Sequence, residues 1–330
     1  MDKDNELEKM VQQHLDNMNL GMTELQKERR RTLCTGTKVS KILGKSKFGT
    51  AYDVFARCKG LVKDNPPTPA MIRGTVFERA ILDYYEIRCG IVLERPDHTM
   101  VHPTEDWAGA SPDAFYQDED GGLVIVDAKT SRSRQDWGEE FSDDMPIDYQ
   151  LQLLWYAYVL GAALDCPVKR LDVCTFFPMQ DEFAIYTMTP DQEVIEKVVE
   201  RCRQWWYRHI VSNVAPEIDG SESASKVVNL SPHLNDDVHQ GDESLVQTIE
   251  ELLSIKKQIK DLDFQKKTLE NSIKNLIGTS SGLYYGGRKA TWKEQKGRSS
   301  VDIKKLTEDH PDLVEAYKKE GKSFRVLRVK

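Results

Sequence analysis

The sequence contains no long uninterrupted apolar run. No segment approaches the roughly 18 consecutive apolar residues that a membrane-spanning helix requires. The first thirty residues are charged throughout and lack the apolar core of a secretory signal. We therefore expect a soluble cytoplasmic protein that does not associate with membranes. With 39% hydrophobic residues among 330, the chain is nevertheless too apolar to be wholly disordered.

Cysteine is scarce, and its spacing matches no metal-binding motif. The six cysteines never occur as Cys-x-x-Cys, the spacing typical of zinc sites and redox motifs. We expect reduced thiols without a ligand, as is usual in the cytoplasm. Three histidines, His98, His102 and His209, also lack a second metal ligand at a recognisable spacing. The sequence shows no internal repeat.

Positive charge is in the minority overall but not at the C-terminus. The net charge is −8, whereas the segment from Lys256 onwards holds 19 Lys and Arg against 10 Asp and Glu. The part before it therefore carries −17. Such asymmetry is typical either of a region that binds nucleic acid or of a solvated basic surface, and composition leaves both open.

Periodicity and composition divide the chain into four segments. We predict an N-terminal helix over residues 1–29, a mixed α/β domain over 30–212, a linker over 213–243 and a C-terminal region over 244–330. The linker is rich in Ser, Asp, Asn and Gly and poor in apolar residues. Within the domain, we expect two short helices over 34–61, an amphipathic helix after Pro69 with apolar positions from Ile72 to Tyr84, and helices over 149–160 and 190–211. We expect strands over 91–93, 107–110, 114–116, 123–126, 171–177 and 183–188.

The C-terminal region begins with a heptad pattern. Apolar residues occupy both core positions from Leu245 to Leu276, with Thr248 and Lys266 as exceptions. The pattern predicts a helix of about thirty residues, which could pair within this unit or self-associate; we expect pairing within the chain. A small αβ unit should follow, with a hairpin turning at Gly286-Gly287, a helix over 301–319 and a strand over 324–329.

Ionisable residues gather at the polar end of the predicted strand 123–126. Side chains alternate along a strand, so Asp127 and Lys129 share one face. Asp113 lies 14 positions before Asp127, across a predicted hairpin. Two carboxylates and the carbonyl of Ala128 would form an oxygen-rich site suited to Mg²⁺ or Mn²⁺, beside a lysine able to orient or deprotonate water. The alternative is an Asp–Lys pair on the surface of an edge strand.

These motifs resemble a known family of nucleases. Ser111-Pro112-Asp113 followed by Asp127-Ala128-Lys129 is similar to the core signature of the PD-(D/E)XK nucleases. Gly74-x-x-x-Glu78 before it and Tyr149-x-x-Gln152 after it resemble the lambda exonuclease and YqaJ-type phage recombination exonucleases, over residues 30–210. The resemblance implies a restriction-endonuclease-like α/β core with a mixed central sheet flanked by helices.

The resemblance also implies roles for individual residues. Asp113, Asp127 and the Ala128 carbonyl would bind the metal, with Glu78 in support. Lys129 would assist the attacking water, and these residues with Gln152 would be catalytic. Where many members have glutamate, this chain has Asp127, and Leu154 replaces a second glutamine often found there.

A pocket for the 5′-phosphate of DNA is implied as well. Arg30, Thr37 and Ser111 match the family positions that hold this group, together with Gln152. A guanidinium with two hydroxyls is a good phosphate receptor.

The implied activity is hydrolysis of double-stranded DNA from 5′ ends. It requires Mg²⁺ or Mn²⁺, uses no iron–sulfur cluster, and leaves 3′ single strands for an annealing recombination protein of a phage or prophage in the bacterial cytoplasm. The family also implies a toroidal homotrimer, to which the C-terminal region could add or which it could prevent. The alternatives are an endonuclease of the same fold and a DNA-binding protein without catalysis.

Aromatic and basic residues interleave near the C-terminus, a composition typical of nucleic-acid contact. The residues expected to touch DNA are Arg288, Lys289, Trp292, Lys293 and Arg298. The alternative is a small cap whose aromatic side chains form its own core.

Overall fold

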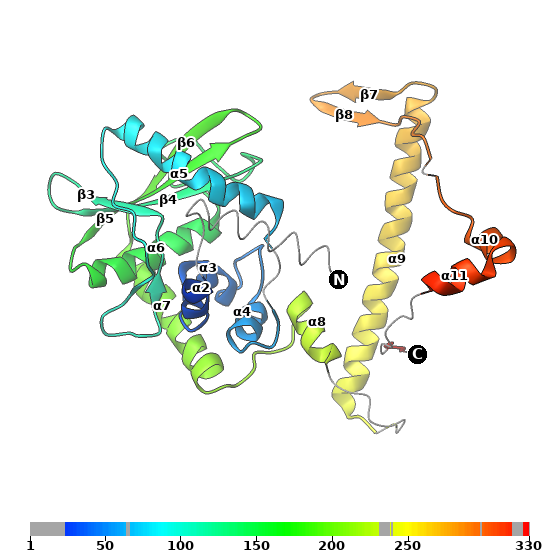
Figure 1. Ribbon diagram of the computed structural model, residues 1–330, viewed down its shortest axis with the longest axis horizontal. Coiled ribbons are helices and arrows are strands. Elements are labelled where there is room, and N and C mark those ends of the chain that lie inside the picture. The colour runs from blue at the N-terminus through cyan, green and yellow to red at the C-terminus, as the bar shows by residue number, and fades with distance from the viewer. Residues whose placement is uncertain are drawn as a thin grey trace. The chain divides into compact units, whose positions relative to one another are not determined.

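The computed structural model describes residues 24–63, 67–230, 238, 240–297, 299–318 and 326–329 (Figure 1). The chain forms two compact units, Met1–Ser231 and Pro232–Lys330. Most of the helix predicted over residues 1–29 lies outside the described residues, and α2 (Glu24–Arg31) covers its end. In the described part of the chain, no helix combines the length and apolar character needed to cross a membrane.

A four-stranded mixed sheet forms the centre of unit 1. Its strands, in spatial order, are β3 (Ala114–Gln117), β4 (Leu123–Thr130), β5 (Val168–Phe177) and β6 (Glu182–Met188). β4 and β5 are parallel, and the other two pairs are antiparallel. Parallel neighbours need a long crossover, which contains helix α6 (Ile147–Ala163). The predicted α/β class, with a mixed sheet flanked by helices, is confirmed.

Helices cover both faces of this sheet (Figure 1). Helix α5 (Pro69–Cys89) buries Ile81 and Tyr85 against Val124 and Val126 of β4. On the other face, α6 and α7 (Gln192–Trp206) pack against alternate β4 residues such as Ile125. Because both faces are covered, the apolar run in β4 is buried throughout, as expected for an internal strand. A π-helix (Tyr207–Val211) continues α7.

Two short helices precede α5, as predicted. Helix α3 (Gly36–Ile42) and helix α4 (Ala51–Cys58) are joined by a turn in which Gly44 and Gly49 have φ of 65° and 149°. Such positive values favour glycine. Thr50 caps α4 by accepting a hydrogen bond from the Asp53 N–H, and the Asp53 carboxylate accepts one from the Thr50 N–H. This capping box fixes where α4 begins.

Two predictions about the strands and the linker were wrong in part. Residues 91–93 form no strand; a single bridge joins Glu94 to Phe115, while β1 (Met100–Val101) and β2 (Gly109–Ala110) pair in a small separate sheet. The predicted linker contains helix α8 (Glu222–Asn229), whose Ala224 packs against α4. Such short elements depend on tertiary contacts that local periodicity does not reveal.

Unit 2 contains the predicted long helix and hairpin. Its elements are α9 (Glu243–Ile277), β7 (Gly282–Tyr285), β8 (Arg288–Thr291), α10 (Ile303–Asp309) and α11 (Pro311–Tyr317). The helix predicted over 301–319 divides because Pro311 lacks the N–H needed to continue α10 and begins α11 instead. The predicted strand 324–329 is not formed over residues 326–329, and residues 324–325 lie outside the described part.

Candidate active site

Asp113 and Asp127 meet where β3 and β4 pair. Ala114 pairs with Val126, so the residue before it, Asp113, lies across from Asp127 on the same face of the antiparallel pair. The Asp113 carboxylate accepts a hydrogen bond of 2.8 Å from the Ala128 N–H. Asp127 is only 1% exposed. Two carboxylates distant in sequence are thus neighbours at one end of the hairpin.

Lys129 lies on the Asp127 side of β4, as strand alternation predicts. Its amine donates a hydrogen bond to Asp127 Oδ2. It also lies 3.4 Å from the Ala128 carbonyl oxygen and 5.4 Å from the centre of the Tyr149 ring. Burial lowers the pKa of Lys129, although Asp113 and Glu78 act in the opposite direction. A lysine with a lowered pKa exchanges a proton near neutral pH more readily than an exposed one.

Glu78 joins this group from α5. Removal of its carboxyl group from water and the negative charge of Asp113 raise the pKa of Glu78 to about 7, and Lys129 offsets part of this effect. The residue as a whole retains solvent exposure. Burial and the neighbouring Asp113 charge both disfavour the ionised form of Glu78. A bound cation would favour the ionised form instead.

The donor set for such a cation consists of two aspartates and one carbonyl. No cluster of three or more His, Cys, Asp or Glu side chains arranged to hold a metal occurs among the residues that the structure describes. Glu78 therefore supports the site electrostatically rather than completing a side-chain cage. Carboxylate and carbonyl oxygens are nevertheless the ligands that Mg²⁺ and Mn²⁺ prefer, and Mg²⁺ is commonly held by one or two carboxylates. The residues present fit such an ion.

Gln152 connects the aspartates to a second group of residues. Its amide nitrogen donates to Tyr156 Oη at 2.7 Å and lies 3.4 Å from Asp127 Oδ1. Tyr156 Oη in turn donates to the Ser111 carbonyl at 3.0 Å, and the Ser111 hydroxyl shares a hydrogen bond with Thr99. Gln152 is 6% exposed. This buried chain of hydrogen bonds fixes the Asp127 side of the site.

Arg30 and Thr37 approach the same network from α2 and α3. Thr37 is exposed and follows Gly36, where a Cβ atom would lie 2.8 Å from the Tyr156 ring and 2.9 Å from Gln152. The positive charge of Arg30 acts on Tyr156. Of the residues expected to bind phosphate, Arg30 and the Ser111 carbonyl therefore interact with Tyr156, and Thr37 follows the glycine that packs against it.

Sequence reasoning missed two residues that organise this region. It assigned Tyr156 to the core alone, although Tyr156 lies four positions after Gln152 and so on the same helix face. It did not consider Lys38, whose amine donates to the carbonyls of Arg30 and Leu33, each at 2.6 Å. Lys38 thereby holds the turn between α2 and α3. The role of Lys38 is visible from the hydrogen bonds of its amine in the folded chain, and no sequence pattern indicates it.

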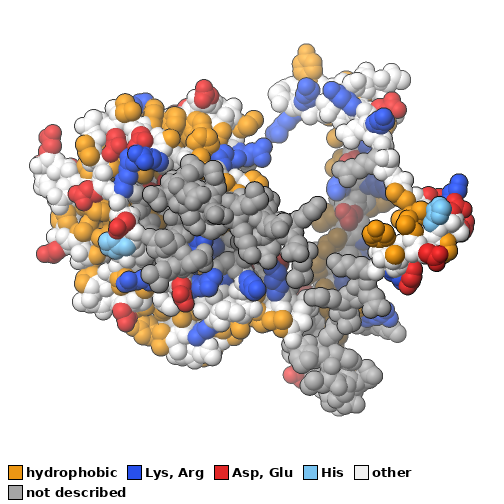
Figure 2. Space-filling view, in the orientation of Figure 1, with side chains coloured by type: hydrophobic (Ala, Val, Ile, Leu, Met, Phe, Trp, Pro, Cys, Tyr) orange, Lys and Arg blue, Asp and Glu red, His pale blue; other side chains and the backbone are white. Residues whose placement is uncertain are grey.

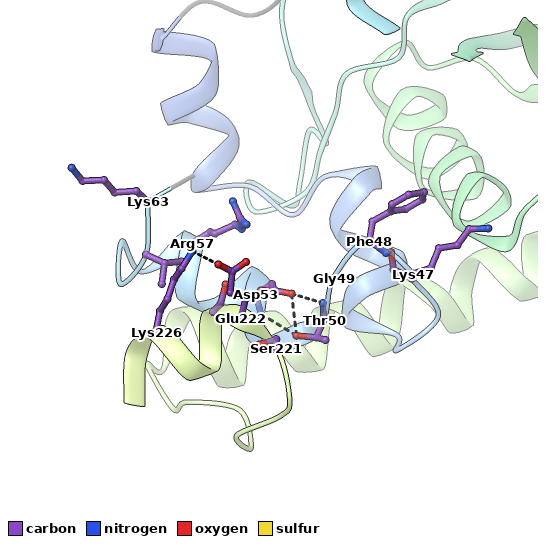
Figure 3. Close-up of a pocket in the computed structure, with 13 residues that line it drawn as sticks. Lys47, Phe48, Gly49, Thr50, Asp53, Arg57, Lys63, Ser221, Glu222 and Lys226 are labelled. Atoms are coloured by element: carbon purple, nitrogen blue, oxygen red, sulfur yellow. Dashed lines mark hydrogen bonds and ion pairs between the residues drawn. The ribbon is translucent and has the colours of Figure 1, made fainter. Parts of the chain in front are cut away.

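A separate cavity of about 370 Å³ lies beside α4 and α8 and contains none of these residues (Figure 3). Lys226 pairs with Glu222 at 2.9 Å and Lys47 with Asp136 at 2.6 Å. Figure 3 shows Lys47 and Lys63 pointing in different directions. The charges around this cavity do not converge on a common ligand position.

The residues expected to touch DNA in unit 2 lie on and after the hairpin. Tyr285 pairs with Arg288 and Tyr284 with Lys289, and Figure 2 shows basic side chains gathered there, at the upper right. The two tyrosines are 91% and 86% exposed, and Trp292 is 51% exposed. These rings therefore do not form a core of their own. Lys293 is exposed, and Arg298 lies outside the described residues.

Three comparisons with known proteins bear on identity. The chain is 26% identical over 300 residues to "Uncharacterized protein YqaJ" of Bacillus subtilis (strain 168), covering 89% of this chain and 90% of that protein. Two solved structures are also similar. An alkaline exonuclease (LHK-Exo) from Laribacter hongkongensis has 16% identity, a TM-score of 0.45 and coverage of 58% of this chain and 94% of its own. A phage related exonuclease from Haemophilus somnus 129PT has 14% identity, a TM-score of 0.40 and coverage of 55% and 96%.

The family comparison covers the segment that contains the candidate site. Residues 26–163 match the model of the YqaJ-like viral recombinase domain. This segment includes both aspartates, Lys129 and Gln152. The resemblance recognised in the sequence, to the YqaJ-type phage recombination proteins, is therefore confirmed.

Proposed function

We propose that this chain is a metal-dependent exonuclease that degrades one strand of double-stranded DNA from its 5′ end. The observation that carries the proposal is the β3–β4 register, which sets Asp113 opposite Asp127 beside the partly buried amine of Lys129. Phosphodiester hydrolysis requires an activated water and compensation for negative charge. The match to a viral recombinase domain supports the proposal, because a 3′ single strand is the substrate of an annealing recombination protein.

The aspartates would hold Mg²⁺ or Mn²⁺ together with the Ala128 carbonyl, and Glu78 would balance the charge from α5. The ion would supply a nucleophilic hydroxide at neutral pH and offset charge on the phosphate. The Asp113 carboxylate is already oriented by the Ala128 N–H. The Gln152 amide orients the Asp127 carboxylate in the same way. Little rearrangement of the two aspartates would therefore be needed to hold the ion.

Lys129 would handle the proton of the attacking water. Its lowered pKa increases the neutral fraction available to accept a proton. Asp127 and the Tyr149 ring hold its amine in place. In its protonated form, the same amine would stabilise negative charge that develops on the phosphate.

Arg30, Thr37 and Ser111 would bind a 5′-phosphate with Gln152. A guanidinium and hydroxyl groups provide charge-assisted hydrogen bonds to phosphate oxygens. The charge effect of Arg30 on Tyr156 and the hydrogen bond from Tyr156 to the Ser111 carbonyl support this role. Farther along the chain, Arg288 and Lys289 would contact the DNA backbone, while the exposed rings beside them and Trp292 would stack on bases.

The proposal is tested with linear duplex DNA labelled at either end, beside a covalently closed circle, in Mg²⁺ and in EDTA. We expect Mg²⁺-dependent loss of 5′-ended strands and an intact circle. Asp113→Asn should lower the rate at least about 1,000-fold while DNA binding persists. Asp120→Asn, in the exposed turn of the same hairpin, should leave the rate unchanged.

The same assay distinguishes the alternatives. Cleavage of the closed circle would indicate an endonuclease, and DNA binding without cleavage in either metal would indicate a binding protein. Arg30→Gln should reduce the preference for 5′-phosphorylated over 5′-hydroxyl ends more than it reduces overall affinity. An unchanged preference would remove Arg30 from the phosphate pocket.

A further inference from the structure

Helix α9 carries an apolar stripe that remains exposed among the described residues. The helix spans 35 residues, about 52 Å at the usual rise. The heptad pattern predicted that this helix pairs within the chain, but such pairing is not seen among the described residues. The exposed core-position residues, between 44% and 72% accessible, are Leu245, Ile255, Ile259, Leu262, Leu269, Ile273 and Leu276.

Such a stripe is costly in water. Burying one large aliphatic side chain contributes about 1.5–3 kcal/mol, and most helical stability in proteins comes from packing of an apolar face. Heptads sustained over this length favour a coiled coil. The residues of the stripe also indicate which partner fits it.

The apolar stripe is self-complementary in an antiparallel pair of helices. Its midpoint lies between Lys260 and Asp261. In an antiparallel alignment about that point, core positions of one helix face core positions of the other in complementary layers. The fully aliphatic layers are Leu245 with Leu276, Leu252 with Leu269, and Ile259 with Leu262.

One of the two exceptions to the heptad pattern, Lys266, determines the direction. In the antiparallel alignment, Lys266 faces Ile255 and can extend its amine past that side chain to water. Thr248 faces Ile273. In a parallel pair in register, Lys266 would face its own copy, which places like charges together in the core at a cost in free energy. Lys266 therefore favours the antiparallel pair.

Flanking charges agree with this direction. Lys256 directly follows the core residue Ile255, and Asp263 directly follows the core residue Leu262. In the antiparallel alignment, Lys256 of one helix lies close to Asp263 of the other. The symmetry gives two such ion pairs. We propose that α9 binds α9 of a second copy of this chain as an antiparallel two-stranded coiled coil, independently of nuclease activity.

Sedimentation equilibrium of the full chain tests the pairing. Leu252→Asp/Leu269→Asp places charge in the stripe, and Gln247→Asp/Asn271→Asp adds the same charge on the opposite, exposed face. We expect the unaltered chain and Gln247→Asp/Asn271→Asp to have twice the mass of Leu252→Asp/Leu269→Asp. The dissociation constant of the α9 pairing should rise at least 100-fold in Leu252→Asp/Leu269→Asp. Equal masses for all three, or a ratio of three, would overturn the proposal.

Disulfide cross-linking tests the direction. Leu252→Cys chains mixed with Leu269→Cys chains should form a cross-linked dimer upon oxidation, above the background from the native cysteines. Leu252→Cys chains alone should not, because the antiparallel helices place these positions roughly 25 Å apart. Cross-linking of Leu252→Cys chains alone would show a parallel pair and contradict the proposal.

Discussion

At the scale of single residues, the pKa of Glu78 reports how the site balances its charges. Its value of about 7 lies above the ordinary 4.5 because of burial and the charge of Asp113. Because the pKa of Glu78 is raised in the folded state, its contribution to the free energy of unfolding is fully present below pH 4.5 and is lost as the pH rises through 7. The ionised carboxylate is therefore the unfavourable form when no cation is bound.

We expect Glu78→Gln to stabilise the metal-free protein increasingly as the pH rises from 5.5 to 8. The gain should reach about 1 kcal/mol, because solvent screens a partly exposed group. Denaturant unfolding in EDTA, followed by tryptophan fluorescence, measures it. Glu196→Gln, on the exposed face of α7, serves as the control with no pH-dependent difference. A pH-independent effect of Glu78→Gln would contradict the charge balance described above.

At the scale of elements, the contact between α3 and α6 shapes the site. A Cβ atom on Gly36 would lie 2.8 Å from the Tyr156 ring and 2.9 Å from the Gln152 side chain. Gly36→Ala should therefore displace both side chains and destabilise unit 1 by about 1–3 kcal/mol. Gly74→Ala, within α5, meets its first neighbour only at 3.9 Å and should stabilise by about 0.5–1 kcal/mol.

Urea unfolding midpoints of the two alanine variants check this difference. The cleavage rate of Gly36→Ala should also fall, since Gln152 orients Asp127. Equal midpoints for both variants would mean that α3 moves away from α6 without cost.

Elements also show what the sequence could reveal. The period of two in a strand was enough to place Asp127 and Lys129 on one face, and the apolar run before them identified β4 as internal. Helix α8 was missed because only two small apolar side chains, Ala224 and Val227, pack it against the cluster around α4, too few for a periodic pattern. The hydrogen bond from Tyr156 to Ser111 joins residues 45 positions apart, which no local pattern encodes.

At the scale of the whole molecule, the two compact units should unfold separately. Five of the six tryptophans belong to unit 1 and only Trp292 to unit 2. In a Trp292→Phe chain, fluorescence therefore follows unit 1 alone, whereas far-UV circular dichroism also follows the 35-residue α9. We expect two transitions that do not coincide, so that a single free energy of unfolding does not describe the chain.

Protein concentration distinguishes the two transitions further. A helix held by a second copy melts at a temperature that rises with concentration, because association stabilises the folded form by mass action. The dichroism transition of α9 should therefore shift upwards over a hundredfold increase in concentration. Leu252→Asp/Leu269→Asp should abolish that shift, and Gln247→Asp/Asn271→Asp should retain it. A single transition, seen identically by both probes and at every concentration, would show instead that α9 melts together with unit 1.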